Sequence, residues 1–340
     1  MAETQKLTNR VKLGTLLAKP LTIPGHWLNS IRRNPIILKE LRGRMRSWRT
    51  LFTVSLYVGL LSIFAVLTYA ITMPRPNYNG YSNYYYNEGY ERLGTDIFSA
   101  VIAVQLILIA LLAPGFTSGV LSGEKERQTY EILLLTLLRP AEIVFGKLFS
   151  TLLYLFLLIT AALPVESIVF LVGGVGIDQL LIGLVVPVAT AMLLGSLGIA
   201  WSSILSTSGR ASRAAYVTGA IMFLGLPALG LPLKVLFYGF DGGSDSDYFL
   251  LNWASAFNPG VAVVATNEIL ITQSGGFSFK VHNAFYYIRS NGDFYPMPWL
   301  VFLIMALALS ILFIVIAIRF VKPLKTDGDL ARKGKNKKKK

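Results

Sequence analysis

Six long apolar runs constrain this chain more than any other feature of its sequence. They lie near residues 51–73, 96–120, 143–172, 179–206, 214–240 and 297–321. Each is close to or longer than the roughly 20 residues that a helix needs to cross about 30 Å of hydrocarbon. Only 15% of the 340 residues are charged, whereas a soluble domain has about a quarter. The sequence therefore predicts an all-α integral membrane protein with six transmembrane helices, forming one transmembrane domain over 51–321.

Proline residues predict bends within the longer runs. Pro114, Pro164 and Pro187 lie in the second, third and fourth runs, and Pro227 and Pro232 lie in the fifth. Each proline removes one backbone N–H from a helix and disturbs the turn before it. We expect bends that serve packing, with a functional hinge as the alternative at each position.

The distribution of charge predicts the topology. The net charge is +14, and 21 of the 32 Lys and Arg residues lie in 1–50 and 319–340. Basic tails that flank membrane spans follow the positive-inside rule and touch anionic lipid, so we expect lipid contacts and no nucleic-acid partner. The polar, basic start does not resemble a cleavable signal peptide. We expect a multi-pass protein of the cell membrane with both termini cytoplasmic, including a basic tail at 322–340.

The cytoplasmic N-terminal segment, 1–50, contains a pattern typical of a helix that lies along the membrane surface. Between residues 34 and 50, apolar and basic residues recur together at intervals of three and four. An apolar face would lie in lipid and the cations at the phosphates. The residues expected to form its charged and aromatic contacts are Lys39, Glu40, Arg42, Arg46, Trp48 and Arg49. An ordinary basic flank of the first span is the alternative.

Dense charge of both signs returns between the second and third runs, from Ser122 to Lys147. As one helix, this stretch would place Glu124, Arg127 and Glu131 at i, i+3 and i+7 of a single exposed face. Such a face would either dock on a partner or form a self-contained salt ladder. The residues assigned to docking are Glu124, Lys125, Glu126, Arg127, Thr129, Tyr130 and Glu131. A leucine-rich segment follows, which we expect to be buried against lipid or protein.

This stretch resembles the signature loop of the permease subunits of type-2 ABC exporters. The likeness rests on the order of Glu124 and Glu126, the Thr-Tyr-Glu of 129–131, the leucine run, Pro140 and the Gly-Lys of 146–147. Residues 34–50 also resemble the interfacial helix of one branch of that family. The resemblance implies a permease that pairs with a second permease copy and with separate ABC ATPase subunits. It also implies a cytoplasmic coupling helix at 124–131 that contacts the ATPase, and short helices around 253–273.

Motifs for chemistry within the chain itself are missing. No Gly-rich loop with Lys and Ser or Thr for phosphate and magnesium is present, so ATP and Mg²⁺ would bind the partner ATPase. There are no cysteines, and the two histidines, His26 and His282, lack metal-ligand spacing. We therefore expect a transporter subunit that is not itself an enzyme and holds no cofactor or metal.

The remaining ionisable residues bear on ion coupling and on the choice of substrate. The ionisable groups within the runs are expected towards their outer ends, which argues against an ion relay near the midplane. They are Asp96, Glu166, Asp178 and Lys234. A secondary carrier and a membrane scaffold or assembly factor remain the alternatives, and no residue selects a substrate. The Tyr-rich loop at 75–94 suits the headgroup belt or a flexible cap, with sugar stacking as the alternative.

Overall fold

The computed structural model describes residues 48–73, 83–135, 139–238, 243–272, 279–283, 285–289 and 294–321. Most of the expected interfacial helix at 34–50 therefore lies outside the described residues, including Lys39, Glu40, Arg42 and Arg46. The side chain of Arg49 and the basic tail at 322–340 lie outside them as well. Trp48 begins the first described helix, and its side chain is exposed.

Six of the described helical stretches are long and apolar enough to cross a membrane, which confirms the predicted fold class. The elements in chain order are α4 (Trp48–Thr72), α5 (Asn83–Thr117), α6 (Ser122–Glu126), α7 (Tyr130–Leu134), α8 (Pro140–Val172), α9 (Ile177–Ile204), α10 (Ser208–Ala220), the π-helical turn η1 (Ile221–Gly225), α11 (Leu226–Ala228), α12 (Gly230–Tyr238), α13 (Gly243–Phe257), α14 (Pro259–Thr272), β1 (Phe279–Asn283), β2 (Tyr286–Arg289), β3 (Phe294–Pro296) and α15 (Pro298–Phe320). The spans are α4, α5, α8, α9, the series α10 to α12, and α15.

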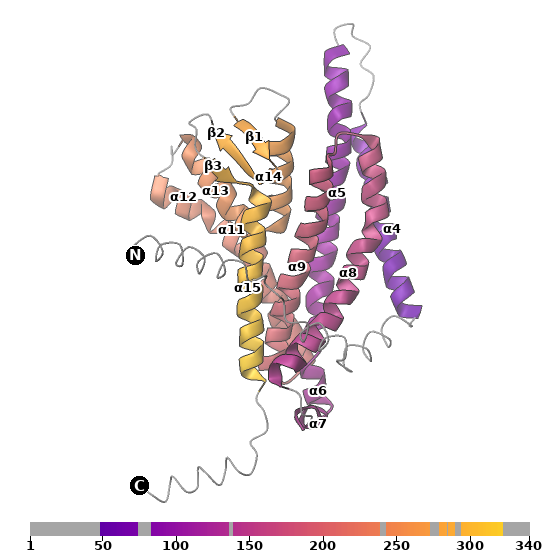
Figure 1. Ribbon diagram of the computed structural model, residues 1–340, viewed down its shortest axis with the longest axis vertical. Helices are drawn as coiled ribbons and strands as arrows, with labels where there is room; N and C mark the ends of the chain where they lie inside the picture. The colour runs from indigo at the N-terminus through magenta and orange to yellow at the C-terminus, as the bar shows by residue number, and fades with distance from the viewer. Residues whose placement is uncertain are drawn as a thin grey trace, which may run out of the picture.

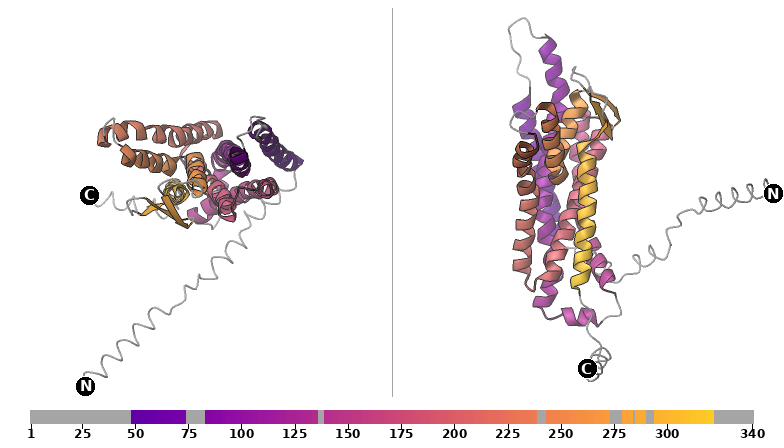
Figure 2. Two further views of the ribbon diagram at one scale, coloured as in Figure 1. Left: turned by 90° about the horizontal axis from the view of Figure 1, so that it is seen from above. Right: turned by 90° about the vertical axis from the view of Figure 1, so that its left-hand side faces the viewer.

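Helix α9 forms the centre of the bundle and contacts α5, α8, α10, α14 and α15. The most apolar 18 residues of α9 are 67% buried inside the chain. The corresponding residues of α4 and of the α10–α12 span are each only 11% buried. In Figures 1 and 2, α4 lies at one edge of the bundle and α12 and α13 lie at the opposite edge. The two edge spans therefore leave most of their apolar surface for lipid or for another subunit.

Glycine allows the central helices to approach closely. A Cβ atom on Gly198 of α9 would collide with the side chain of Thr117 on α5. At the other end of the bundle, a Cβ on Gly94 would collide with the backbone carbonyl of Gly173. Small residues at such contacts are typical of membrane helices, where backbones pack by van der Waals contact.

The prolines act differently in different spans. Pro114, Pro164 and Pro187 lie inside α5, α8 and α9, which continue past them. The fifth span, in contrast, is divided into α10, η1, α11 and α12. Pro227 has no N–H to donate to the Phe223 carbonyl four residues earlier. The proline therefore leaves the Phe223 carbonyl without its usual helical donor, in the part of the span that is divided.

Two side chains, from α13 and from the residue between α13 and α14, donate to carbonyls of the divided span. Asn258 Nδ2 donates to the Phe223 carbonyl at 2.9 Å, and Trp253 Nε1 donates to the Leu226 carbonyl at 2.7 Å. The Asn258 side-chain oxygen also accepts hydrogen bonds from the first backbone N–H groups of α14, those of Gly260 and Val261. One asparagine thus caps α14 and holds the broken span.

Two features away from the charged stretch were not predicted. Strands β1, β2 and β3 form an antiparallel sheet in that order, with Tyr287 paired to Val281 and Tyr295. The helix expected at 253–273 is, in contrast, present as the end of α13 and as α14. The second unpredicted feature is the start of α5 at Asn83. The second half of the expected loop at 75–94 is therefore helical. Its polar residues carry no apolar period, but they lack a proline that would stop the helix.

Candidate functional site

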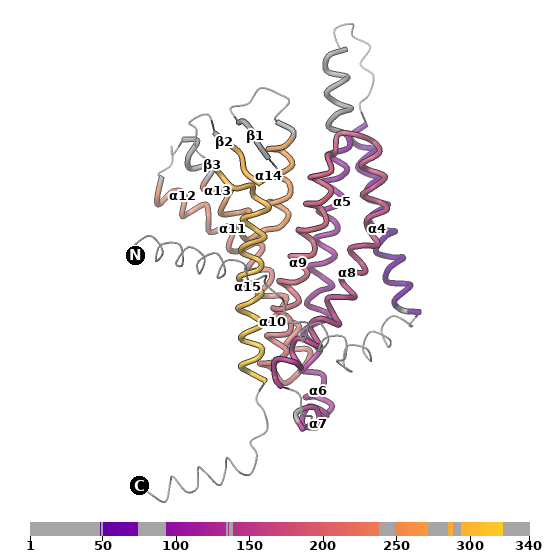
Figure 3. The backbone as a smooth tube through the Cα atoms, viewed as in Figure 1, coloured from indigo at the N-terminus to yellow at the C-terminus, as the bar shows by residue number. Residues whose placement is uncertain are grey.

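The charged stretch forms an elbow, residues 122–135, at the end of the bundle where α8 and α10 begin (Figure 3). It contains two short helices, α6 and α7, so the prediction of one continuous helix is wrong. Gln128 has a left-handed backbone with φ of 59°. The Thr129 N–H reaches back to the Glu124 carbonyl at 3.0 Å, and the Gln128 N–H reaches the Lys125 carbonyl at 3.2 Å. These two bonds form a Schellman-type helix end, which separates Glu124 from the face that carries Glu131.

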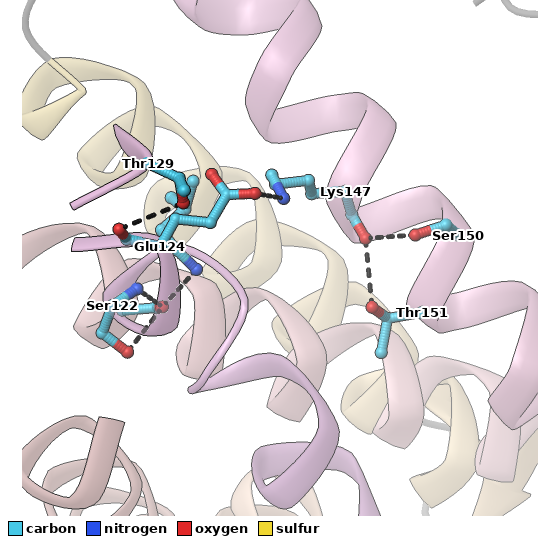
Figure 4. A network of polar contacts seen from close by, with 8 residues as sticks. Ser122, Glu124, Thr129, Lys147, Ser150 and Thr151 are labelled. Carbon is cyan, nitrogen blue, oxygen red and sulfur yellow. Dashed lines mark hydrogen bonds and ion pairs between the residues drawn. The ribbon is translucent and has the colours of Figure 1, made fainter. Parts of the chain in front are cut away.

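Glu124 is bound to the third span rather than to Arg127. Its Oε1 accepts a hydrogen bond from Lys147 Nζ of α8 at 2.6 Å (Figure 4). The side chain of Lys147 is 5% exposed and that of Glu124 is 27% exposed. The expected alternation of charges along one face is therefore replaced by an ion pair between the elbow and α8.

Lys125 is bound to the end of the fourth span. Its Nζ donates to the carbonyl oxygens of Ser202, Ser203 and Leu205, at 3.3, 2.5 and 3.2 Å. These carbonyls belong to the last turn of α9 and to the residue that caps it. A cation is favourable there, because the last carbonyls of a helix lack partners and carry partial negative charge.

Glu126 is bound to the start of the fifth span. Its carboxylate accepts hydrogen bonds from the backbone N–H of Ser208 at 2.9 Å and from the Ser208 hydroxyl at 2.6 Å. Ser208 is the first residue of α10, where an acidic group complements the positive end of the helix. Glu124, Lys125 and Glu126, here called the anchor residues, therefore bind three different spans.

A serine on α9 adds a further attachment that sequence reasoning missed. Ser202 Oγ accepts hydrogen bonds from the backbone N–H groups of Leu121 and Ser122, each at 2.9 Å, at the beginning of α6. Ser202 is fully buried. The polar cluster WSSILSTS at 201–208, at the end of an apolar run, is the sequence signal that marks both Ser202 and Ser208.

Helix α7 has an inner and an outer side. Tyr130 and Leu133 pack against a small apolar cluster formed by α8, α9 and α15 at this end of the bundle. Lys125 Nζ lies 5.4 Å from the centre of the Tyr130 ring, and burial, together with the charge of Glu124, raises the pKa of the Tyr130 hydroxyl. The inner side thus fixes α7 to the bundle.

The outer side of α7 and the turn before it are exposed. The exposed residues Arg127, Glu131, Ile132 and Leu135 form what is here called the docking face. Ile132 is 65% and Leu135 is 73% exposed, so neither is buried within this chain, and their predicted burial against lipid or protein would need a surface outside it. Thr129 is also exposed, and its hydroxyl donates to the Glu124 carbonyl at 3.4 Å. Of the seven residues predicted for docking, only Arg127, Thr129 and Glu131 are left free of the anchoring and packing contacts.

The comparison with known families decides the class of protein. Residues 34–323 match the family described as ABC-2 family transporter protein. The chain belongs to the ABC-2 transporter family. A comparison with curated proteins gave no match. Together with the six apolar helices, the family shows a multi-pass membrane protein of the permease type, and it implies an ABC ATPase partner in general.

Metal chemistry has no support in the described part of this permease. Within those residues, no group of three or more His, Asp or Glu side chains is placed to hold a metal ion.

Proposed function

We propose that this permease is the membrane-spanning subunit of an ATP-driven exporter of the cell membrane. Two permease copies, either of this chain or of a related one, would enclose the translocation pathway. Separate ATPase subunits would bind ATP and Mg²⁺ on the cytoplasmic side, where the elbow and both termini would lie. Family membership and the construction of the elbow support this proposal.

The observation that carries the proposal is the set of bonds made by the three anchor residues. Adjacent positions 124, 125 and 126 bind α8, α9 and α10 respectively. For the partly buried Glu124 and Lys125, a hydrogen bond to a charged group contributes about 1.5–3 kcal/mol. The exposed Glu126 adds two hydrogen bonds to Ser208. A force on the elbow would therefore move the near ends of three spans together, which is what coupling to an external ATPase requires.

The docking face supplies the surface on which that force would act. It combines one cation, Arg127, one anion, Glu131, and two exposed apolar side chains, Ile132 and Leu135. Interfaces commonly place apolar side chains at the centre and charges at the rim, where charge complementarity selects the partner. We infer that Ile132 and Leu135 enter a groove of the ATPase, with Arg127 and Glu131 at its edge.

Two spans that bury little surface within the chain are the ones that we expect to move when the pathway opens. Helix α4 and the α10–α12 span bury little of their surface within the chain, and α10 is attached to the elbow through Glu126. The same span is divided at η1 and Pro227, where an interrupted hydrogen-bond ladder permits bending. Movement of the elbow would thus reach a span that can bend.

Charge reversal on the docking face tests the proposal. The permease is co-expressed with the ABC ATPase encoded beside its gene, and complex formation and ATP hydrolysis are measured in detergent and in proteoliposomes. Glu131→Arg is expected to reduce co-purification and hydrolysis at least tenfold, with normal folding. Asp178→Arg makes the same charge change at an exposed position at the other end of the bundle and is expected to have no effect on the complex.

The outcome separates the proposal from its alternatives. Normal assembly and normal hydrolysis with a well-folded Glu131→Arg variant would remove the docking face from the mechanism. A secondary carrier would transport its solute without any ATPase. A scaffold would bind a partner without moving a solute, so transport in proteoliposomes distinguishes all three.

A further inference from the structure

Three buried polar side chains meet inside the membrane-spanning part of the bundle, far from the elbow. Tyr57 comes from α4, Gln105 from α5 and Glu166 from α8, and their residues are 2%, 0% and 1% exposed. None of them takes part in the docking and anchoring contacts described above. They are here called the intramembrane triad.

The triad is incompletely hydrogen-bonded. The Gln105 carboxamide interacts with both the Tyr57 hydroxyl and the Glu166 carboxyl group. However, both Glu166 oxygens, both polar atoms of Gln105 and the Tyr57 hydroxyl are buried without a hydrogen bond at the separations in this structure. Buried polar groups in folded proteins are nearly always paired, so five unpaired atoms in one place require a specific explanation.

The triad lies in the half of the bundle that is distant from the elbow. Gln105 is 12 residues from Leu93, where the apolar part of the second span begins, and 12 residues from Thr117, where α5 ends. At 1.5 Å per residue, each distance is about 18 Å. Gln105 and Glu166 are also each 19 residues from the Glu124–Lys147 ion pair, which places them at a similar height.

Glu166 lies six residues before the end of α8 that is distant from the elbow, which agrees with the sequence expectation. The carboxyl group was expected towards the outer end of its span, because Glu166 is close to the end of its apolar run at Val172. Helix α8 has 33 residues and is about 50 Å long at 1.5 Å per residue, so it extends well past the hydrocarbon thickness. At this level of the bundle Glu166 is buried beside Gln105 and Tyr57.

Among the side chains that the structure describes, none provides a positive charge beside Glu166. Besides Tyr57, the described titratable side chains on α8 and on the helices packed against it are Tyr69, Asp96, Glu142, Lys147, Tyr154, Asp178 and Arg319. Of these, Asp96, Asp178 and Arg319 are exposed, and Lys147 is paired with Glu124 at the elbow. An ionised carboxylate without a counter-charge costs several kcal/mol in an apolar interior.

A neutral carboxyl group fits the triad much better. It has one O–H donor and one carbonyl acceptor, whereas a carboxylate has acceptors only. The Gln105 carboxamide offers the matching acceptor and donor, so small changes of side-chain rotamer would give a reciprocal pair of hydrogen bonds. The Tyr57 hydroxyl could bind the remaining amide hydrogen or oxygen.

We propose that Tyr57, Gln105 and Glu166 form an intramembrane proton-binding site, with the proton on the Glu166 carboxyl group while α4 is packed against α5 and α8. Helix α4 is the edge span and is only 11% buried over its apolar window. Separation of α4 from α5 would admit water to the triad. The carboxyl O–H bond would then break, the proton would pass to water and the carboxylate would remain hydrated.

Infrared spectroscopy of the purified full-length chain in lipid nanodiscs tests the site without any ATPase, so its result is independent of the proposed export function. At neutral pH, the wild-type spectrum is expected to contain a C=O stretch of a neutral carboxyl group that shifts in D₂O. Glu166→Gln keeps the shape and the amide pairing and is expected to remove this band. Asp178→Asn, which removes an exposed carboxyl group, is expected to leave it unchanged.

A second variant tests the role of α4. Tyr57→Ala opens space for water beside Glu166 and is expected to raise the ionised fraction of its carboxyl group at neutral pH at least about tenfold. An ionised fraction that does not change would overturn the link between α4 packing and proton binding.

A measurement on the wild-type chain covers the case in which Glu166→Gln does not fold. Dicyclohexylcarbodiimide reacts with protonated carboxyl groups in apolar surroundings: the carboxyl proton moves to a carbodiimide nitrogen, and the carboxyl oxygen bonds the central carbon. A mass-spectrometric adduct on the peptide containing Glu166 supports the proposal. A wild-type chain with neither this adduct nor the neutral-carboxyl band contradicts it, and a band that disappears on addition of sodium ions would show a metal-cation site instead.

Discussion

Glu124 and Lys147 form an ion pair whose two members differ in exposure. We therefore expect the substitution of one to lower the stability of the protein more than the substitution of the other. Glu124→Gln leaves the Lys147 ammonium group, on a side chain that is only 5% exposed, without its counter-charge. Lys147→Met leaves the Glu124 carboxylate, on a side chain that is 27% exposed. Both side chains line the same hollow of about 450 Å³, but a larger fraction of Glu124 is exposed. Water can therefore reach the glutamate much better than the lysine.

The magnitudes follow from this difference in solvation. Removal of one partner from a buried ion pair costs about 3–5 kcal/mol, whereas an exposed pair is worth about 0.2–1 kcal/mol. We expect Glu124→Gln to lower the free energy of unfolding by about 3 kcal/mol and Lys147→Met by about 1.5 kcal/mol. The double variant leaves no unpaired charge and is expected to lose about 2 kcal/mol, so the coupling energy is about 2.5 kcal/mol.

Equilibrium unfolding in mixed micelles titrated with SDS, followed by tryptophan fluorescence, measures the four proteins of this double-mutant cycle. The control cycle uses the same chemical changes on the docking face, Glu131→Gln and Arg127→Met, which are both exposed and are expected to stay within about 0.5 kcal/mol of the wild type. Additivity of Glu124→Gln and Lys147→Met within about 0.5 kcal/mol would refute the ion pair as an attachment of the elbow.

Three further results are expected. Gly198→Ala should lower stability by about 1–3 kcal/mol in the same assay, because the added methyl group overpacks the contact of α9 with α5; a stability equal to the wild type would contradict the close approach. Asn258→Asp should keep the cap of α14 but lose the donor to the Phe223 carbonyl, with a loss of about 1–3 kcal/mol, whereas no loss would show that the broken span is held by other contacts. In this cysteine-free chain, Thr129→Cys should react with a membrane-impermeant thiol reagent in inverted vesicles only, and Asp178→Cys in intact cells only; the reverse pattern would place the elbow outside the cell.

The spans and the place of the elbow were predictable because both depend on local composition. Twenty or more apolar residues need no knowledge of the rest of the chain to indicate a span, and charged residues between two spans indicate a segment outside the hydrocarbon. The structure contains the six spans and places the elbow between α5 and α8 as expected.

The internal arrangement of the elbow was not predictable in the same way. The turn at Gln128 is marked by neither glycine nor proline, the usual signals for a left-handed backbone. The partners of the anchor residues lie far along the chain: Ser208 is 82 residues beyond Glu126, and Ser202 is 77 residues beyond Lys125. A local pattern shows that these residues are charged, but only the packing of α8, α9 and α10 shows where the charges go.

The sheet and the start of α5 illustrate a different difficulty. Strands β1 to β3 contain five, four and three residues, too few for an alternation of apolar and polar residues to stand out. Their position is instead specified by contacts such as the burial of Tyr287 and its stacking on Tyr295. These contacts join residues of two different strands and leave no periodic trace in the sequence.

Three neighbouring residues hold three different helices. This arrangement also restricts how the chain can vary in length. A residue inserted into or deleted from α6 would rotate everything after it by about 100° around the helix axis. At least one of the attachments to Lys147, to the end of α9 and to Ser208 would then point away from its target. Related chains are therefore free to change the composition of the docking face for a different ATPase, but they should keep the number of residues between the end of α5 and Gln128.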